Sequence, residues 1–209
     1  MNRRFYGALI ALIAFCAFFL LGRGLGESPD QPWLLVAEQT WVGHGALFAW
    51  WLTWLCYGPV LAPLWVALII IAIRYPRWRA RAIFSIVAIL LAWQGADFFQ
   101  HFFARPRRVD WIVKHETAFS YPSSHAAMSM AFYLLWSLFI ARSNLVGRAW
   151  VALLLALLGF GILWARLALG AHYLTDVLGG VLWGVAVVGT LSALWPINVF
   201  EGRKEPSLE

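Results

Sequence analysis

Three polar clusters interrupt a chain that is otherwise strongly apolar, and each contains side chains that could bind or transfer a phosphoryl group. In chain order they are residues 105–108 (Arg-Pro-Arg-Arg), residues 121–125 (Tyr-Pro-Ser-Ser-His), and a spaced set of Arg166, His172 and Asp176. Guanidinium groups bind phosphate oxygens through paired hydrogen bonds. Histidine can act as a nucleophile or as a general acid near pH 7. These residue types together match what phosphoryl transfer needs.

The spacing within the clusters adds to this interpretation. Asp176 follows His172 by one helical turn, so its carboxylate could hold the Nδ1 proton and leave the Nε2 lone pair free to attack. Pro-Ser-Ser is typical of a helix start, where Ser123 or Ser124 and free backbone N–H groups could bind an anion. His125 could then serve as the second histidine.

Each cluster also has a structural interpretation when taken alone. The arginines could form a solvated loop, the serines could cap a helix, and the His–Asp pair could be an ordinary packing contact. By ligand type alone, His125, His172 and Asp176 could bind a metal, but the neighbouring arginines would repel a cation. We therefore expect no metal and no cofactor.

The composition indicates what kind of fold must position these residues. The chain of 209 residues is 62% hydrophobic and only 12% charged, whereas about a quarter of the residues in a soluble domain are charged. Its mean hydropathy is +0.73. A soluble domain and a disordered chain are excluded. Cys16 and Cys56 both lie in apolar runs, which excludes a disulfide scaffold and a CxxC metal site. An all-α polytopic membrane protein is predicted.

A membrane-spanning helix needs about 20 mostly apolar residues. The sequence contains six such segments, which predicts a bundle of six transmembrane helices in one domain over residues 1–209. The second segment is overlong and contains Pro59 and Pro63, so we expect its first part to be kinked or interfacial. The six predicted spans are residues 4–23, 47–73, 82–104, 125–142, 148–166 and 176–196.

Within this domain we expect an N-terminal span with an outer loop or interfacial segment over residues 1–59, a catalytic core over residues 60–196, and a cytoplasmic tail over residues 197–209. The first segment also has the charge and apolar run of a signal peptide. No small-x-small cleavage site follows it, so we expect an uncleaved anchor.

The basic residues predict the orientation. Ten of the 16 basic residues fall on one side of the predicted bundle, which predicts that both termini lie in the cytoplasm. We expect the protein to lie in the inner membrane. Five of the other six lie within residues 105–114 or at Arg166, on the outer, periplasmic face. An anionic ligand on that face would account for this excess. No basic stripe interleaved with aromatic residues is present, so nucleic acid is not an expected partner.

Arg105-Pro106, residues 122–125 (Pro-Ser-Ser-His) and Arg166-x5-His172-x3-Asp176 resemble the three signature motifs of the type 2 phosphatidic acid phosphatase superfamily. The resemblance covers roughly residues 60–195. It implies a metal-independent membrane lipid phosphatase. His172 would attack phosphorus and form a phosphohistidine, His125 would protonate the leaving oxygen and later activate water, and Asp176 would orient His172. The phosphoryl oxygens would be held by Arg105, Arg166, Ser123 and Ser124.

The chain departs from the family pattern at three positions. The family usually has a lysine seven residues before the arginine of the first motif, and Phe98 occupies that position. Ser124 replaces a usual glycine, and Ala165 stands where a serine is common.

The polar residues around the first motif could compensate for the missing lysine. Asp97, His101 and Arg105 would fall on one stripe of the third span and should face the bundle interior, where we expect Asp97 to pair with an arginine. His101, Arg108 or Lys114 could then supply the absent cation.

Three functions are consistent with these residues. The first is hydrolysis of a lipid phosphate or diphosphate whose tail lies in the bilayer; undecaprenyl diphosphate is favoured, with phosphatidylglycerophosphate and phosphatidic acid as alternatives. The second is phosphotransfer from an isoprenyl diphosphate to lipid A, which the missing lysine would suit. The third is a non-enzymatic anion or lipid transporter. The oligomeric state stays open.

Overall fold

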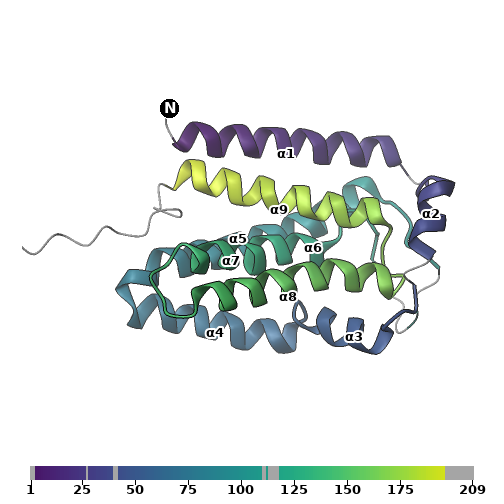
Figure 1. Ribbon diagram of the computed structural model, residues 1–209. Coiled ribbons are helices and arrows are strands. Elements are labelled where there is room, and N and C mark those ends of the chain that lie inside the picture. The colour runs from purple at the N-terminus through teal and green to yellow at the C-terminus, as the bar shows by residue number, and fades with distance from the viewer. Residues whose placement is uncertain (1–2, 27, 40–41, 110–111, 113–117, 196–209) are drawn as a thin grey trace, which may run out of the picture.

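The computed structural model describes residues 3–26, 28–39, 42–109, 112 and 118–195, and no strand occurs in these ranges. Its helices lie side by side in one bundle, with the short helix α2 at one end (Figure 1). The long helices are α1 (Arg3–Leu25), α4 (Gly58–Arg74), α5 (Pro76–Phe103), α8 (Arg148–Ala168) and α9 (Leu174–Leu194). The shorter ones are α2 (Pro32–Gln39), α3 (Ala46–Trp54), α6 (Ser124–Ser129), the π-helical turn η1 (Met130–Leu134) and α7 (Leu135–Ala141).

The described residues contain five helices long and apolar enough to cross a membrane, and six if the pair α3 and α4 forms one span. The axes of α3 and α4 differ by 40°. Pro59 lies in the first turn of α4, where a residue without an N–H group is tolerated, so the chain restarts there as a new helix. The predicted helical membrane bundle and the kink in its second segment are both confirmed.

The third span differs from its predicted bounds at both ends. It begins at Pro76 because proline favours the first helical position. Within its first two turns the guanidinium of Arg81 lies 4.9 Å from the Trp78 ring centroid, a cation–π contact. It ends at Phe103 because Ala104 adopts a left-handed conformation with φ 49°. Arg105 therefore lies outside the helix, and the predicted stripe through Asp97, His101 and Arg105 is wrong at its last member.

Close contact between α6 and α9 brings the second and third motifs together. A Cβ atom at Gly180 would lie 2.3 Å from the Ser123 carbonyl oxygen, and one at Gly184 would lie 2.8 Å from that of Ala127. Only glycine fits at such distances. The Ser123 N–H also donates to the Asp176 carbonyl oxygen at 3.0 Å. Gly180 and Gly184, which are one helical turn apart on α9, thus allow close helix packing within the chain.

Helix α1 lies along α9 and also supports the segment that leads into α6 (Figure 1). The Tyr121 ring stacks on Phe18, with centroids 5.5 Å apart, and its hydroxyl donates to the Phe18 carbonyl oxygen at 2.6 Å. Both side chains are fully buried. Helix α1 is therefore an integral part of the packed bundle.

Candidate active site

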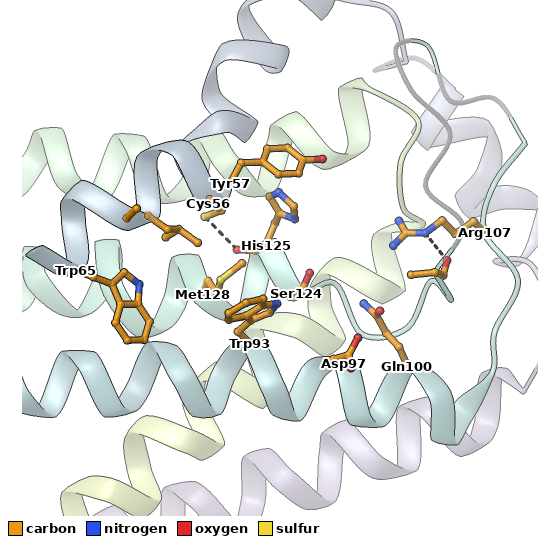
Figure 2. Close-up of a pocket in the computed structure, with 14 residues that line it drawn as sticks. Cys56, Tyr57, Trp65, Trp93, Asp97, Gln100, Arg107, Ser124, His125 and Met128 are labelled. Atoms are coloured by element: carbon orange, nitrogen blue, oxygen red, sulfur yellow. Dashed lines mark hydrogen bonds between the residues drawn. The ribbon is translucent and has the colours of Figure 1, made fainter.

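A cavity of about 590 Å³ lies between α4, α5 and the start of α6. One end is polar and includes Arg107 and His125, whereas the other end is apolar and includes Trp65; Figure 2 shows Arg107 and Trp65 at opposite ends. The side chain of Trp93 is 45% exposed, so the apolar part reaches the outside of the bundle. The cavity is lined by Cys56, Tyr57, Gly58, Leu61, Ala62, Trp65, Trp93, Asp97, Gln100, Arg107, Ala118, Ser124, His125 and Met128.

His125 lies in the first turn of α6 and points into the cavity (Figure 2). Ser123 caps this helix through a hydrogen bond from the Ala126 N–H to its hydroxyl at 3.5 Å, whereas Ser124 lines the cavity. The rings of His125 and Tyr57 form a T-shaped contact, with their centroids 4.9 Å apart. Sequence reasoning missed Tyr57, because no motif surrounds this residue at the start of α4.

His172 is fully buried beside the polar end of the cavity. Its Nε2 atom lies 3.1 Å from Nη1 of Arg107 and accepts that donor, which leaves the ring proton on Nδ1. Nδ1 faces Asp176 at 3.6 Å and the Ser120 hydroxyl at 3.5 Å. Ser120 also donates to the Asp176 carboxylate. Asp176 therefore lies on the Nδ1 side of His172, and the Ser120 hydroxyl contacts both residues.

Arg107 is the arginine of the first cluster that lines the cavity. Besides His172, it donates from Nε to the Ala118 carbonyl oxygen at 2.7 Å and from Nη1 to that of Ala171 at 3.1 Å. The guanidinium is thus in direct contact with Nε2 of His172. A phosphoryl group that enters the cavity would meet Arg107 before it reaches His172.

Arg105 occupies a different place from the one expected. Its side chain is fully buried, and it donates to Asp176 at 2.6 Å and to Asp30 at 2.7 Å. Further donors reach the Thr175 hydroxyl at 2.7 Å and the Ser28 carbonyl oxygen at 3.0 Å. The guanidinium lies behind Asp176 and does not line the cavity, because two buried carboxylates hold it there.

The spacing of seven residues expected for the first motif recurs at Gln100 and Arg107, and both line the cavity. Gln100 is buried and donates to the Pro122 carbonyl oxygen at 2.8 Å. Phe98 is 63% exposed and lies outside the lining. The pair that stands at the cavity is therefore displaced by two residues from the pair chosen from the sequence, because the turn at Ala104 directs Arg105 away from the cavity.

Arg166 is fully buried and donates to the Thr53 hydroxyl at 2.8 Å, which ties α8 to α3. It is not among the residues that line the cavity. Thr53 comes from the N-terminal part of the chain, and no sequence signal marked it.

The auxiliary residues are dispersed. Asp97 lines the cavity, but within the described residues its carboxylate forms no ion pair with an arginine, contrary to expectation. His101 is exposed and contacts its own helix through the Asp97 carbonyl oxygen at 2.8 Å, so its expected position in the bundle interior is wrong. Arg108 pairs with buried Glu38 and is not part of the cavity lining. Lys114 lies outside the described residues.

Glu38 of α2, which sequence reasoning also missed, lies against the start of α9. It accepts from Arg108 and from the Leu174 N–H at 2.9 Å. Burial, together with the neighbouring Asp30, raises the pKa of Glu38 from 4.5 to about 7.

Within the described ranges, no three His, Cys, Asp or Glu side chains gather as a metal-binding group.

Comparisons with known proteins identify a family and two similar proteins. A sequence model of the PAP2 superfamily matches residues 82–199. The putative undecaprenyl-diphosphatase YbjG of Escherichia coli strain K12 is 31% identical over 116 residues, which are 54% of this chain and 52% of the relative. The chain thus spans about half the length of the curated relative it matches.

A solved structure also shares the fold. The transmembrane PAP2-type phosphatidylglycerolphosphate phosphatase from Bacillus subtilis superposes with a TM-score of 0.68 at 19% identity, and the match covers 88% of this chain and 94% of that one. At this identity the likeness concerns the fold alone.

Proposed function

Because the chain belongs to the PAP2 superfamily, we propose that it is a membrane-embedded lipid phosphatase that works through a phosphohistidine at His172. The supporting observation is the position of His172: Nε2 lies 3.1 Å from Arg107, Asp176 stands on the Nδ1 side, and His125 lines the adjoining cavity. The proposed nucleophile thus contacts a phosphate-binding cation and lies beside a carboxylate, and the same cation lines a cavity with the second histidine.

In the first step the Nε2 lone pair of His172 attacks the terminal phosphorus, and the bond from phosphorus to the leaving oxygen breaks. His125 donates a proton to that oxygen, and Asp176 stabilises the positive ring through the Nδ1 proton. In the second step His125 takes a proton from water, and the resulting hydroxide attacks phosphorus. The P–N bond breaks, which releases inorganic phosphate and restores His172.

The phosphoryl oxygens are assigned here to Arg107, the hydroxyl of Ser124 and the backbone N–H groups at the start of α6, with Arg166 and Ser123 behind them. Arg107 replaces Arg105 in this role because it lines the cavity. To admit a phosphoryl group, Arg107 must exchange its bond to Nε2 for a bond to a phosphate oxygen. The same residue then covers the nucleophile at rest and binds the substrate during the reaction.

The apolar end of the cavity supports a lipid substrate. Leu61, Trp65, Trp93 and Met128 continue from the polar end toward the outside of the bundle between α4 and α5. A headgroup could bind at Arg107 while its tail remains in the bilayer. Undecaprenyl diphosphate is the favoured substrate, as the name of the E. coli relative suggests.

We further place the site on the outer face of the inner membrane, with both termini in the cytoplasm. The basic residues that join α4 to α5, among them Arg74, Arg77 and Arg79, lie at the end of these helices opposite the site, where the positive-inside tendency puts cytoplasmic loops.

Phosphate release from the purified protein tests the proposal. The panel would contain undecaprenyl diphosphate, phosphatidylglycerophosphate and phosphatidic acid, with His172→Ala as the control. We expect wild-type turnover and a loss of several orders of magnitude in the variant. If ³²P from the substrate moves to a lipid and not to inorganic phosphate, the protein is a phosphotransferase. If His172→Ala keeps full function, the nucleophile assignment is wrong.

A further inference from the structure

Asp30 lies in the short stretch between α1 and α2, well before the residues that the family model matches. It is 3% exposed, although it is a charged residue in a connecting segment. One carboxylate oxygen accepts from Nη2 of Arg105 at 2.7 Å and from the Thr175 hydroxyl; the other accepts from the Thr175 N–H at 3.2 Å. This places Asp30 against both the first motif and the first turn of α9.

Arg105 connects Asp30 to the catalytic centre. Its Nη2 atom faces Asp30, whereas its Nη1 atom donates to Oδ1 of Asp176 at 2.6 Å. The side chains of these three residues are fully buried. The guanidinium also lies 4.4 Å from the Tyr173 ring centroid, which restricts its plane. A continuous chain of contacts therefore runs from Asp30 through Arg105 and Asp176 to His172.

We propose that Asp30 is a positioning residue for the reaction at His172, acting through Arg105 and Asp176. The inference rests on the proposed function. Arg105 donates to two carboxylates, so its positive charge only partly neutralises the negative charge of Asp176. Asp176 can then still stabilise the positive His172 ring that forms when Nε2 binds phosphorus. Without Asp30, Arg105 would be held by Asp176 alone, and the carboxylate would support His172 less.

The electrostatic setting gives this role a specific signature. The charged groups that face His172 include Arg107 at Nε2 and Asp176 at Nδ1, with Arg105 and then Asp30 behind Asp176. Removal of the negative charge of Asp30 makes the surroundings of His172 more positive. The pKa of the His172 imidazolium should then fall, which moves the acidic limb of the pH–rate profile to lower pH. A loss of packing alone would not move it.

The experiment compares Asp30→Asn with wild-type protein and with a control, Tyr121→Phe. The control removes a buried hydrogen bond between α1 and the segment that leads into α6, without a change of charge. We expect Asp30→Asn to lower kcat about tenfold with KM changed by less than about twofold. The acidic limb of kcat/KM should move down by about half a pH unit or more. Tyr121→Phe should leave that limb in place.

Two results would overturn the inference: a wild-type kcat and limb in Asp30→Asn, or the same limb shift in Tyr121→Phe. If Asp30→Asn does not fold in detergent, Asp30→Glu is measured in its place, because it keeps the charge but displaces it. A wild-type kcat in Asp30→Glu would then contradict the positioning role of Asp30. An active wild-type protein with an unchanged Asp30→Asn profile refutes this inference alone. A wild-type protein inactive on the whole panel refutes the proposed function and this inference together.

Discussion

Arg105 and Arg107 are two positions apart, yet their replacement by alanine should have opposite consequences. Arg105→Ala removes the cation between Asp30 and Asp176, whose side chains are fully buried, as is that of Arg105 itself. An uncompensated buried charge costs about 3–5 kcal/mol. Arg107 is half-buried and donates to two backbone carbonyl oxygens, so its loss should cost about 1–2 kcal/mol of stability.

The effect on turnover should separate the pair in the other direction. Removal of one donor that stabilises transition-state charge lowers rates by about 10²–10³. Arg107→Ala should therefore lose that factor in kcat/KM while it stays folded. Arg105→Ala should lose activity together with folded protein, because its main effect is on the buried network.

Thermal unfolding and phosphate release, measured on the same detergent preparations, provide the two readouts. Arg107→Lys is the matched control, since it keeps the charge but not the paired donors, and it should recover part of the rate. The assignment would be refuted if Arg107→Ala kept wild-type kcat/KM, or if Arg105→Ala melted at the wild-type temperature and lost only substrate binding.

Three further predictions follow from the packing and charges around the site. Gly180→Ala should abolish folding or activity, because its Cβ would lie 2.3 Å from the Ser123 carbonyl oxygen, whereas Gly24→Ala, with no atom within 4 Å of the added Cβ, should be neutral in thermal unfolding. Tyr57→Ala should lower kcat about fivefold through loss of its contact with His125, and Tyr57→Phe should retain it. The pKa of Glu38 is raised to about 7, so the folded protein keeps a proton that the unfolded chain releases above about pH 4.5. Melting temperature should therefore fall as pH rises from 4.5 to 7, and Glu38→Gln should flatten this dependence.

The relative positions of Ser123 and His125, and of His172 and Asp176, could be predicted from the sequence because local geometry determines them. Ser123 caps a helix, and that directs His125 into the first turn regardless of the rest of the fold. His172 and Asp176 lie four residues apart at a helix start, so the His172 ring faces the Asp176 carboxylate. The length of the apolar segments likewise predicted the helical bundle, since spans in lipid must satisfy their own backbone hydrogen bonds.

The first motif could not be placed in this way because a single backbone conformation decides its register. Ala104 adopts a left-handed backbone conformation, which favours glycine, so the turn could not be predicted from an alanine at this position. As a consequence Arg105 turns toward Asp176, and Arg107 reaches the cavity. Asp30 and Glu38 were missed for another reason: their partners are 70 or more residues away in the chain, a separation that no periodicity reports.

The distribution of charge at this end of the bundle follows from the cost of burial. The excess of arginines on the predicted outer face first suggested an anionic ligand, but Arg105 and Arg108 are bound to carboxylates of the protein itself. Such buried carboxylates require paired cations. Arg107, which lines the cavity, has backbone carbonyl oxygens and His172 among its partners, and its bond to His172 can be exchanged for a bond to a phosphate oxygen. Phosphate affinity should therefore depend on this single exchange more than on the number of arginines nearby.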